Sequence, residues 1–119
     1  MVPPLVGAVV ILPFPFSDLS GSKLRPALVL ADAGRGDWIL CQITSKPYGD
    51  PKAVPIASQS FREGGLQLAS YARPGKLFTA NAGIILRRAG MLDAATFQTV
   101  LESVVGLLRP KPATHEHLS

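Results

Sequence analysis

A chain of 119 residues suits one domain with one hydrophobic core, and its 47% hydrophobic content argues against a disordered protein. The 12 Lys and Arg outweigh the 8 Asp and Glu, and the net charge of +4 suits a polyanionic partner such as nucleic acid, although many basic proteins bind nothing in particular. The single cysteine, Cys41, excludes an internal disulfide and a cysteine-based zinc site, and it is typical of the reducing cytoplasm.

Short apolar runs, separated by Gly, Pro and polar residues, predict many strands along most of the chain. The first run lacks a basic start, so we expect no signal peptide there, and no other run is long enough to span a membrane. The expected strands cover residues 7–12, 27–31, 38–45, 52–57, 66–71, 76–79 and 84–88.

The third expected strand alternates clearly between two faces. Ile39, Cys41 and Ile43 share one face, which we interpret as the core face. Thr44 shares the opposite face with Trp38. This alternation predicts that the Thr44 side chain points away from the core.

The pattern changes from a period of two to a helical period after Gly90, which is expected to end the last strand. Asp93 is a good helix N-cap, and Arg109 suits the last turn of a helix, where a cation interacts favourably with the helix dipole. Apolar residues fall at helical spacing at positions 97, 100, 101, 104 and 108. The sequence therefore predicts a mainly β (α+β) fold: a small, strongly bent barrel with a C-terminal helix in residues 1–109, then a flexible tail, 110–119.

Several common catalytic signatures are absent from the sequence. It has no P-loop, dinucleotide-binding fingerprint, zinc-protease motif or nucleophile elbow. His115 and His117 both lie in the expected tail, and the acidic residues are scattered, mostly in turns. The sequence therefore predicts neither a metal site nor a nuclease that uses paired histidines.

Arg25 and the hydroxyl pair Thr44–Ser45 are the remaining candidates for chemistry. RNA can be cleaved without a metal, because its own 2′-OH can attack the adjacent phosphorus. A guanidinium fork suits the charged phosphorane, and a hydroxyl at a strand end can hydrogen-bond a phosphate oxygen. The residues alone leave open that Arg25 is an ordinary surface arginine and that Thr44–Ser45 is an ordinary strand end.

Further residues are candidates for contacts with RNA. Trp38 and Tyr48 suit stacking on bases, although Trp38 fits the core equally well. Asp18 and Ser20, in the loop before Arg25, are candidates to orient or deprotonate a substrate hydroxyl. The candidates for contacts with the phosphate backbone are Lys23, Lys46, Arg73 and Lys76.

Three segments resemble the MazF/PemK family of bacterial toxins in their order and spacing. They are PFPFSDLSGSKLRPALVL at residues 13–30, WILCQITS at 38–45, and SYARPGKLFT at 70–79, followed by a helix. The resemblance implies an SH3-like barrel with a C-terminal helix, and a homodimer whose interface groove holds single-stranded RNA. It also implies cleavage without metal or other cofactor, leaving a 2′,3′-cyclic phosphate and a 5′-OH.

Carried over by position, the resemblance assigns the catalytic arginine to Arg25 and the catalytic hydroxyl to Thr44, with Ser45 as a substitute. Some family members have an acidic residue five positions before the arginine, and this sequence has Ser20 there. The proton acceptor is therefore open, with Asp18 as the candidate. Lys76 stands where some relatives carry a neutral polar residue, which implies a different RNA preference.

The leading hypothesis is the toxin of a type II toxin–antitoxin system, a sequence-selective endoribonuclease of the cytoplasm that acts on mRNA. Its +4 charge and the resemblance predict an acidic antitoxin protein as its inhibitor. Two alternatives remain on the same barrel: a CcdB-like toxin that binds gyrase without enzymatic activity, and an inactive RNA-binding barrel.

Overall fold

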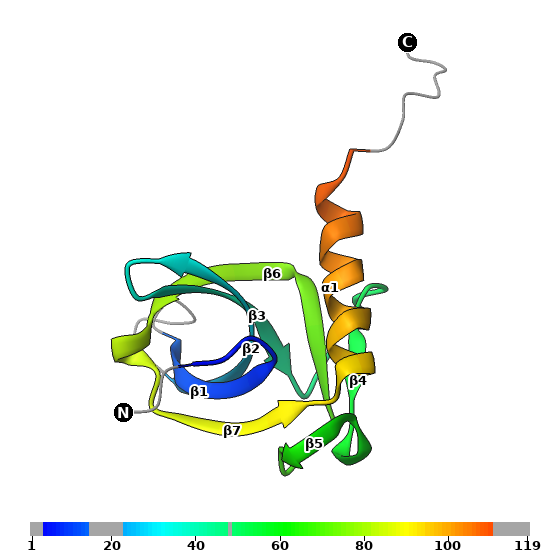
Figure 1. Ribbon diagram of the computed structural model, residues 1–119. Helices are drawn as coiled ribbons and strands as arrows, with labels where there is room; N and C mark the ends of the chain where they lie inside the picture. Colours follow the sequence, from blue (N-terminus) through cyan, green and yellow to red (C-terminus); the bar gives the residue numbers. More distant parts are fainter. Residues whose placement is uncertain (1–3, 15–22, 48, 111–119) are drawn as a thin grey trace.

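The computed structural model describes residues 4–14, 23–47 and 49–110. In these ranges the strands form one antiparallel sheet in the order β4-β6-β3-β2-β1-β7-β5 (Figure 1). The strands are β1 (Ala8–Phe14), β2 (Lys23–Gly34), β3 (Asp37–Thr44), β4 (Val54–Ile56), β5 (Phe61–Gly64), β6 (Ser70–Asn81) and β7 (Arg87–Leu92). One helix follows, α1 (Ala94–Leu108), and two short 3-10 turns cover Ser58–Ser60 and Ala82–Ile84. The predicted mainly β fold with a C-terminal helix is thus confirmed.

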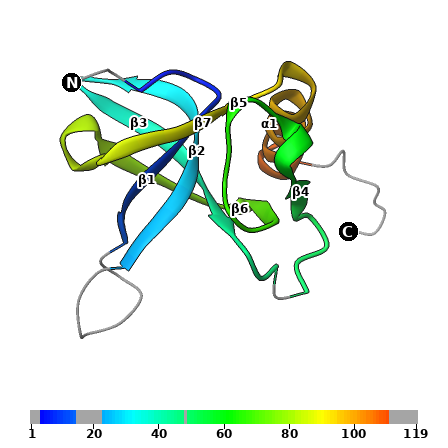
Figure 2. The ribbon, with the colours of Figure 1, turned by 90° about the horizontal axis from the view of Figure 1, so that it is seen from below.

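The sheet is strongly curled rather than flat. Phe14 on β1 and Phe78 on β6 form an edge-to-face pair with ring centroids 4.9 Å apart. Strands β2 and β3 lie between β1 and β6 in the sheet order, so this contact requires the sheet to bend back on itself. Figure 1 shows the resulting half-barrel around β1 and β2, and Figure 2 shows α1 beside β4 and β5 at one side of it.

Both faces of the central strands are buried. Successive residues of a strand point to opposite faces, so Val9 and Val10 of β1 contribute to two different apolar clusters. Val100 and Val104 of α1 cover the cluster that contains Val9. The other cluster lies inside the curl and contains Phe14. The strands are therefore held rigidly from both sides.

The expectation that only one face of β3 belongs to the core is wrong. Leu40 is fully buried on the face that was expected to point away from the core, because the curl of the sheet covers that face as well. Cys41 is also fully buried, and its thiol donates a hydrogen bond to the carbonyl oxygen of Arg73 at 3.1 Å. Burial raises the pKa of Cys41 to about 12, so the thiol is protonated at neutral pH.

Strand β2 begins earlier than expected, so that Arg25 and Pro26 lie within it rather than before it. Residues 23–26 pair only with β1, whereas pairing with β3 begins at Ala27, opposite Gln42. Proline has no N–H to donate to a neighbouring strand, so it is tolerated where one edge of a strand is free. The start of β2 therefore has one paired edge and one open edge.

The two strands expected at 66–71 and 76–79 form one long strand, β6, with a wide bulge. Cys41 of β3 is opposite Leu77, and Ile43 is opposite Ala72, so residues 73–76 face the single residue Gln42. This bulge carries Arg73 and Lys76, two of the expected RNA contacts.

The expected helix is confirmed at its N-terminus, where a carboxylate oxygen of Asp93 accepts a hydrogen bond from the backbone N–H of Thr96 at 2.7 Å. Arg109 is the C-cap residue rather than part of the last turn. The expected tail from 111 onward lies outside the described residues. No helix in the described ranges is long and apolar enough to cross a membrane.

Gly90 does not end the last strand as expected but lies inside β7, where it pairs with both neighbouring strands. A Cβ at this position would lie 2.6 Å from the carbonyl oxygen of Glu63 and 2.8 Å from the backbone nitrogen of Gly65. The sequence missed this role because β5, which comes this close, was not expected at all. Only glycine fits between these two backbones.

Gly90→Ala should therefore lower the free energy of unfolding by about 1–3 kcal/mol, because the backbone of β5 must shift to accommodate the methyl group. Gly106→Ala is the matched control, since no atom other than the backbone of its own helix and its chain neighbours lies within 4 Å of its Cβ position. A helix favours alanine over glycine, so this control should raise the free energy of unfolding by up to about 1 kcal/mol. Urea denaturation of both variants checks the prediction, and equal stability of the two would contradict it.

Candidate functional site

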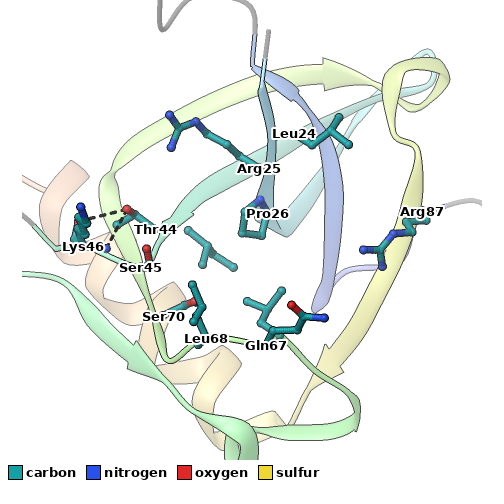
Figure 3. Close-up of a pocket in the computed structure, with 12 residues that line it drawn as sticks. Leu24, Arg25, Pro26, Thr44, Ser45, Lys46, Gln67, Leu68, Ser70 and Arg87 are labelled. Carbon is teal, nitrogen blue, oxygen red and sulfur yellow. Dashed lines mark hydrogen bonds between the residues drawn. The ribbon is translucent and has the colours of Figure 1, made fainter.

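A cavity of about 460 Å³ opens at the free edge of β2 (Figure 3). Its walls come from the start of β2, the end of β3 and the two residues after it, the loop 65–69, and the starts of β6 and β7. The lining residues are Leu24, Arg25, Pro26, Ile43, Thr44, Ser45, Lys46, Leu66, Gln67, Leu68, Ser70 and Arg87. The cavity therefore brings Arg25 close to the Thr44–Ser45 pair, although Arg25 and Thr44 are 19 positions apart in the sequence.

Arg25 is half-buried and pairs across the sheet with Leu12 of β1. Because β2 has no partner on its other side here, its open edge leaves room for the guanidinium. Figure 3 shows the guanidinium on the side of the cavity where Thr44 and Lys46 lie. The Arg25 side chain forms no ion pair or hydrogen bond with the described part of the chain, so its guanidinium N–H groups are available to an anion.

The Thr44 hydroxyl is hydrogen-bonded to the loop that follows β3. Its hydroxyl accepts a hydrogen bond from the backbone N–H of Lys46 at 3.1 Å and donates one to the carbonyl oxygen of Lys46 at 3.2 Å. Only 6% of Thr44 is exposed. Ser45, in contrast, is exposed, and its hydroxyl has no hydrogen-bond partner among the described residues. The free hydroxyl of this pair is therefore that of Ser45, and Thr44 fixes the turn that presents it.

The expected RNA contacts are scattered around the molecule. Lys46 lines the cavity, whereas Lys23 and Lys76 are exposed outside its lining. Arg73 forms an ion pair with Asp50 in which Nε and Oδ2 are 3.0 Å apart, and both side chains are largely buried. The backbone N–H of Lys52, with help from Arg73, holds the pKa of the Asp50 carboxyl below its usual value.

Other expected site residues cannot be placed at the cavity. Asp18, Ser20 and Tyr48 lie outside the described residues. Trp38 is half-buried against the cluster inside the curl and is not part of the cavity lining. Base stacking by Trp38 at this cavity therefore has no support in the structure.

Arg87 and Gln67 line the cavity although sequence reasoning did not single them out. Arg87 begins β7 and pairs with Ile11 of β1, and Ile11 in turn pairs with Pro26 of β2. Gln67 belongs to a loop with no recognisable motif. Nothing in the local sequence around either residue indicates a site, because only strand pairing brings them here.

Among the described residues, the charged ones that line this cavity are all cations, namely Arg25, Lys46 and Arg87. No three His, Cys, Asp or Glu side chains within the described ranges gather where they could hold a metal ion. The remaining lining is largely aliphatic, and Ser45 and Gln67 supply neutral polar groups. Such a cavity can bind an anionic ligand that also has an apolar portion.

A curled antiparallel sheet with one C-terminal helix and a basic cavity at its open edge defines a class of small half-barrel β proteins. The sequence model for "PemK-like, MazF-like toxin of type II toxin-antitoxin system" matches residues 6–108. The chain therefore belongs to the PemK/MazF toxin family, as its three sequence segments indicated.

Solved structures share this fold at low sequence identity. The chain is similar to MazF in a MazE–MazF crystal structure from Deinococcus radiodurans, with TM-score 0.73 and 21% identity over 91% of this chain and 97% of that chain. It is also similar to an endoribonuclease in complex with its cognate antitoxin from a mycobacterial species, with TM-score 0.67 and 18% identity over 94% and 100% of the two chains. A search of curated proteins gives no significant match.

Thr44→Ala should lower the free energy of unfolding by about 1–2 kcal/mol, because it removes both hydrogen bonds to the Lys46 backbone from a nearly buried position. Ser45→Ala is the neighbouring control and should change stability by less than about 0.5 kcal/mol, since its hydroxyl is exposed and unpartnered. Chemical denaturation of the two variants measures the difference. Equal losses would show that the Thr44 hydrogen bonds do not stabilise the fold.

Proposed function

We propose that this toxin is an endoribonuclease that cleaves single-stranded RNA, such as mRNA, at selected sequences without a metal ion. The observation that carries the proposal is the placement of Arg25 and the Ser45 hydroxyl at one cavity whose described charged lining residues are all cations. Family membership supports the reaction, and a structural relative is described as an endoribonuclease. The absence of a metal requirement rests on the family resemblance and on the chemistry of RNA itself.

In the proposed reaction the 2′-OH of one ribose attacks the adjacent phosphorus, and the bond from phosphorus to the 5′-oxygen of the next nucleotide breaks. The products are a 2′,3′-cyclic phosphate and, once a proton has been added to the leaving oxygen, a 5′-OH. Negative charge builds up on the non-bridging oxygens of the phosphorane. The Arg25 guanidinium stabilises that charge because its fork matches two oxygens and remains protonated.

Two hydroxyls have different tasks in this proposal. Ser45 donates its free hydrogen to a phosphate oxygen, while Thr44 holds the turn so that Ser45 and Lys46 face the cavity. The described residues of the cavity lining include no carboxylate or imidazole to take the proton from the 2′-OH. Asp18 and Ser20, outside the described residues, stay the candidates for the proton acceptor.

The proposed partners follow from the same surface. A basic cavity suits an acidic antitoxin that folds over it, and relatives of similar fold are solved together with MazE and with a cognate antitoxin. We also propose a homodimer with an RNA groove at its interface, acting in the cytoplasm. Lys23, Arg73 and Lys76 stay proposed contacts to RNA beyond the cavity, as does Tyr48.

The proposed function is tested with a long single-stranded RNA in excess chelator and with the same sequence carrying deoxyribose at the cut site. The wild type should cut only the RNA, and Arg25→Ala should cut it about 10²–10³-fold more slowly because the phosphorane loses its charged donor. Arg62→Ala is the control, since Arg62 is exposed on β5 and does not line the cavity. Cleavage of the deoxy substrate, or RNA binding without any cleavage, would overturn the mechanism.

The two hydroxyls should differ in how they affect cleavage. Ser45→Ala should lower kcat with little change in stability, because it removes only the contact with phosphate. Thr44→Ser should retain activity, because serine keeps the hydroxyl that bonds the Lys46 backbone. Single-turnover cleavage rates and thermal melting curves of both variants test this difference. Full activity of Ser45→Ala, together with loss of activity in a folded Thr44→Ala protein, would return the catalytic role to the Thr44 hydroxyl.

A further inference from the structure

Arg87 holds a position in the cavity that the proposed chemistry does not use. It lies at the start of β7, and β1 separates it from Pro26 of β2. With neighbouring strands about 4.8 Å apart, its backbone stands roughly 10 Å from that of Pro26. Figure 3 shows its guanidinium directed into the cavity from the side opposite Thr44 and Lys46.

The fold makes no evident use of the Arg87 charge. The next residue, Arg88, lies near Glu63 with 3.9 Å between Nη1 and Oε2, whereas the Arg87 side chain has neither an ion pair nor a hydrogen bond within the described ranges. Arg87 is exposed, and its strand is fixed on β1, the same strand that pairs with Arg25. An unpaired cation is thus held on the same rigid sheet as Arg25.

The surface between the two arginines is apolar. Leu24, Pro26 and Ile43 line the cavity there, and Leu24 is 60% exposed. A ligand that contacts both cations therefore needs anionic groups at two places with a less polar portion between them. Consecutive phosphates of a polynucleotide, joined by a ribose that carries a base, have this chemistry.

We propose that Arg87 binds a phosphate of the RNA that neighbours the scissile one, and so sets the position of the strand across Arg25. The inference rests on the proposed function and adds a second phosphate subsite to it. A contact with a phosphate that does not react is the same in the ground state and the transition state. Losing it should therefore weaken RNA binding and raise KM, with little effect on kcat.

The first test measures binding, so that it does not depend on cleavage. A fluorescent RNA oligonucleotide with deoxyribose at the cut site is titrated with wild type, Arg87→Gln and Arg88→Gln. Arg87→Gln should weaken binding about 10-fold, as expected for one lost charged hydrogen-bonding contact, and should lower the slope of log K against log salt by about 0.7. Arg88→Gln is the matched control and should leave binding within about twofold, because Arg88 does not line the cavity.

The second test locates the phosphate. Neutral methylphosphonates are placed one at a time at the phosphates flanking the cut site. One of them should weaken wild-type binding about as much as Arg87→Gln does, and the same change should cost the Arg87→Gln protein almost nothing further. Additive losses at every flanking phosphate would overturn the inference, as would equal binding by Arg87→Gln and wild type.

These outcomes separate the subsite from the proposed reaction. If the wild type binds through Arg87 but never cuts RNA, the nuclease proposal fails and the phosphate subsite stands. If the wild type cuts RNA and Arg87→Gln binds it equally well, the subsite fails and the nuclease proposal stands. A change in oligomeric state on Arg87→Gln, measured by light scattering, would assign Arg87 to contacts between copies and overturn the inference.

Discussion

The change of pairing partners along β2 determines where this protein can have a site. From Ala27 onward the strand is paired on both sides, but over residues 23–26 it pairs with β1 alone. Pro26 lacks the N–H that a second neighbour would need, so β3 is not continued alongside the start of β2. The open edge creates the cavity, and it places Arg25 beside the hydroxyls at the end of β3.

The rest of the fold keeps that edge rigid. The two apolar clusters bury both faces of the central strands, and α1 covers one of them. The cations Arg25 and Arg87 therefore project from strands, whereas Ser45 lies in a turn that the Thr44 hydroxyl ties to the backbone of Lys46. In the proposed reaction, groups carried by this framework would need little reorganisation when a phosphate enters, which is what electrostatic stabilisation of a transition state requires.

The positive charge of the cavity depends on where the acidic residues lie and what they bind. Each described carboxylate interacts with a partner close to it and does not line the cavity. The pairs are Asp32 with the backbone of Gly34, Asp37 with Asn81, Asp50 with Arg73, Glu63 with Arg88, Asp93 with the backbone of Thr96, and Glu102 with Gln98. No described carboxylate lines the cavity, so the described part of its lining is positively charged.

The sequence by itself determined the β class, the capped C-terminal helix and the family, because these depend on local periodicity and on short segments whose order is visible in the chain. It also singled out Arg25 and the Thr44–Ser45 pair, which the fold brings to one cavity. Only the tertiary structure placed Arg87 there, because its position depends on β7 pairing with β1 across most of the chain length. Likewise, only the turn after β3 shows that the Thr44 hydroxyl is hydrogen-bonded whereas that of Ser45 is free among the described residues. Only the bulge in β6 places Arg73 next to Asp50. The periodicity of the sequence cannot predict these contacts, because they depend on which strand edges meet in the folded protein.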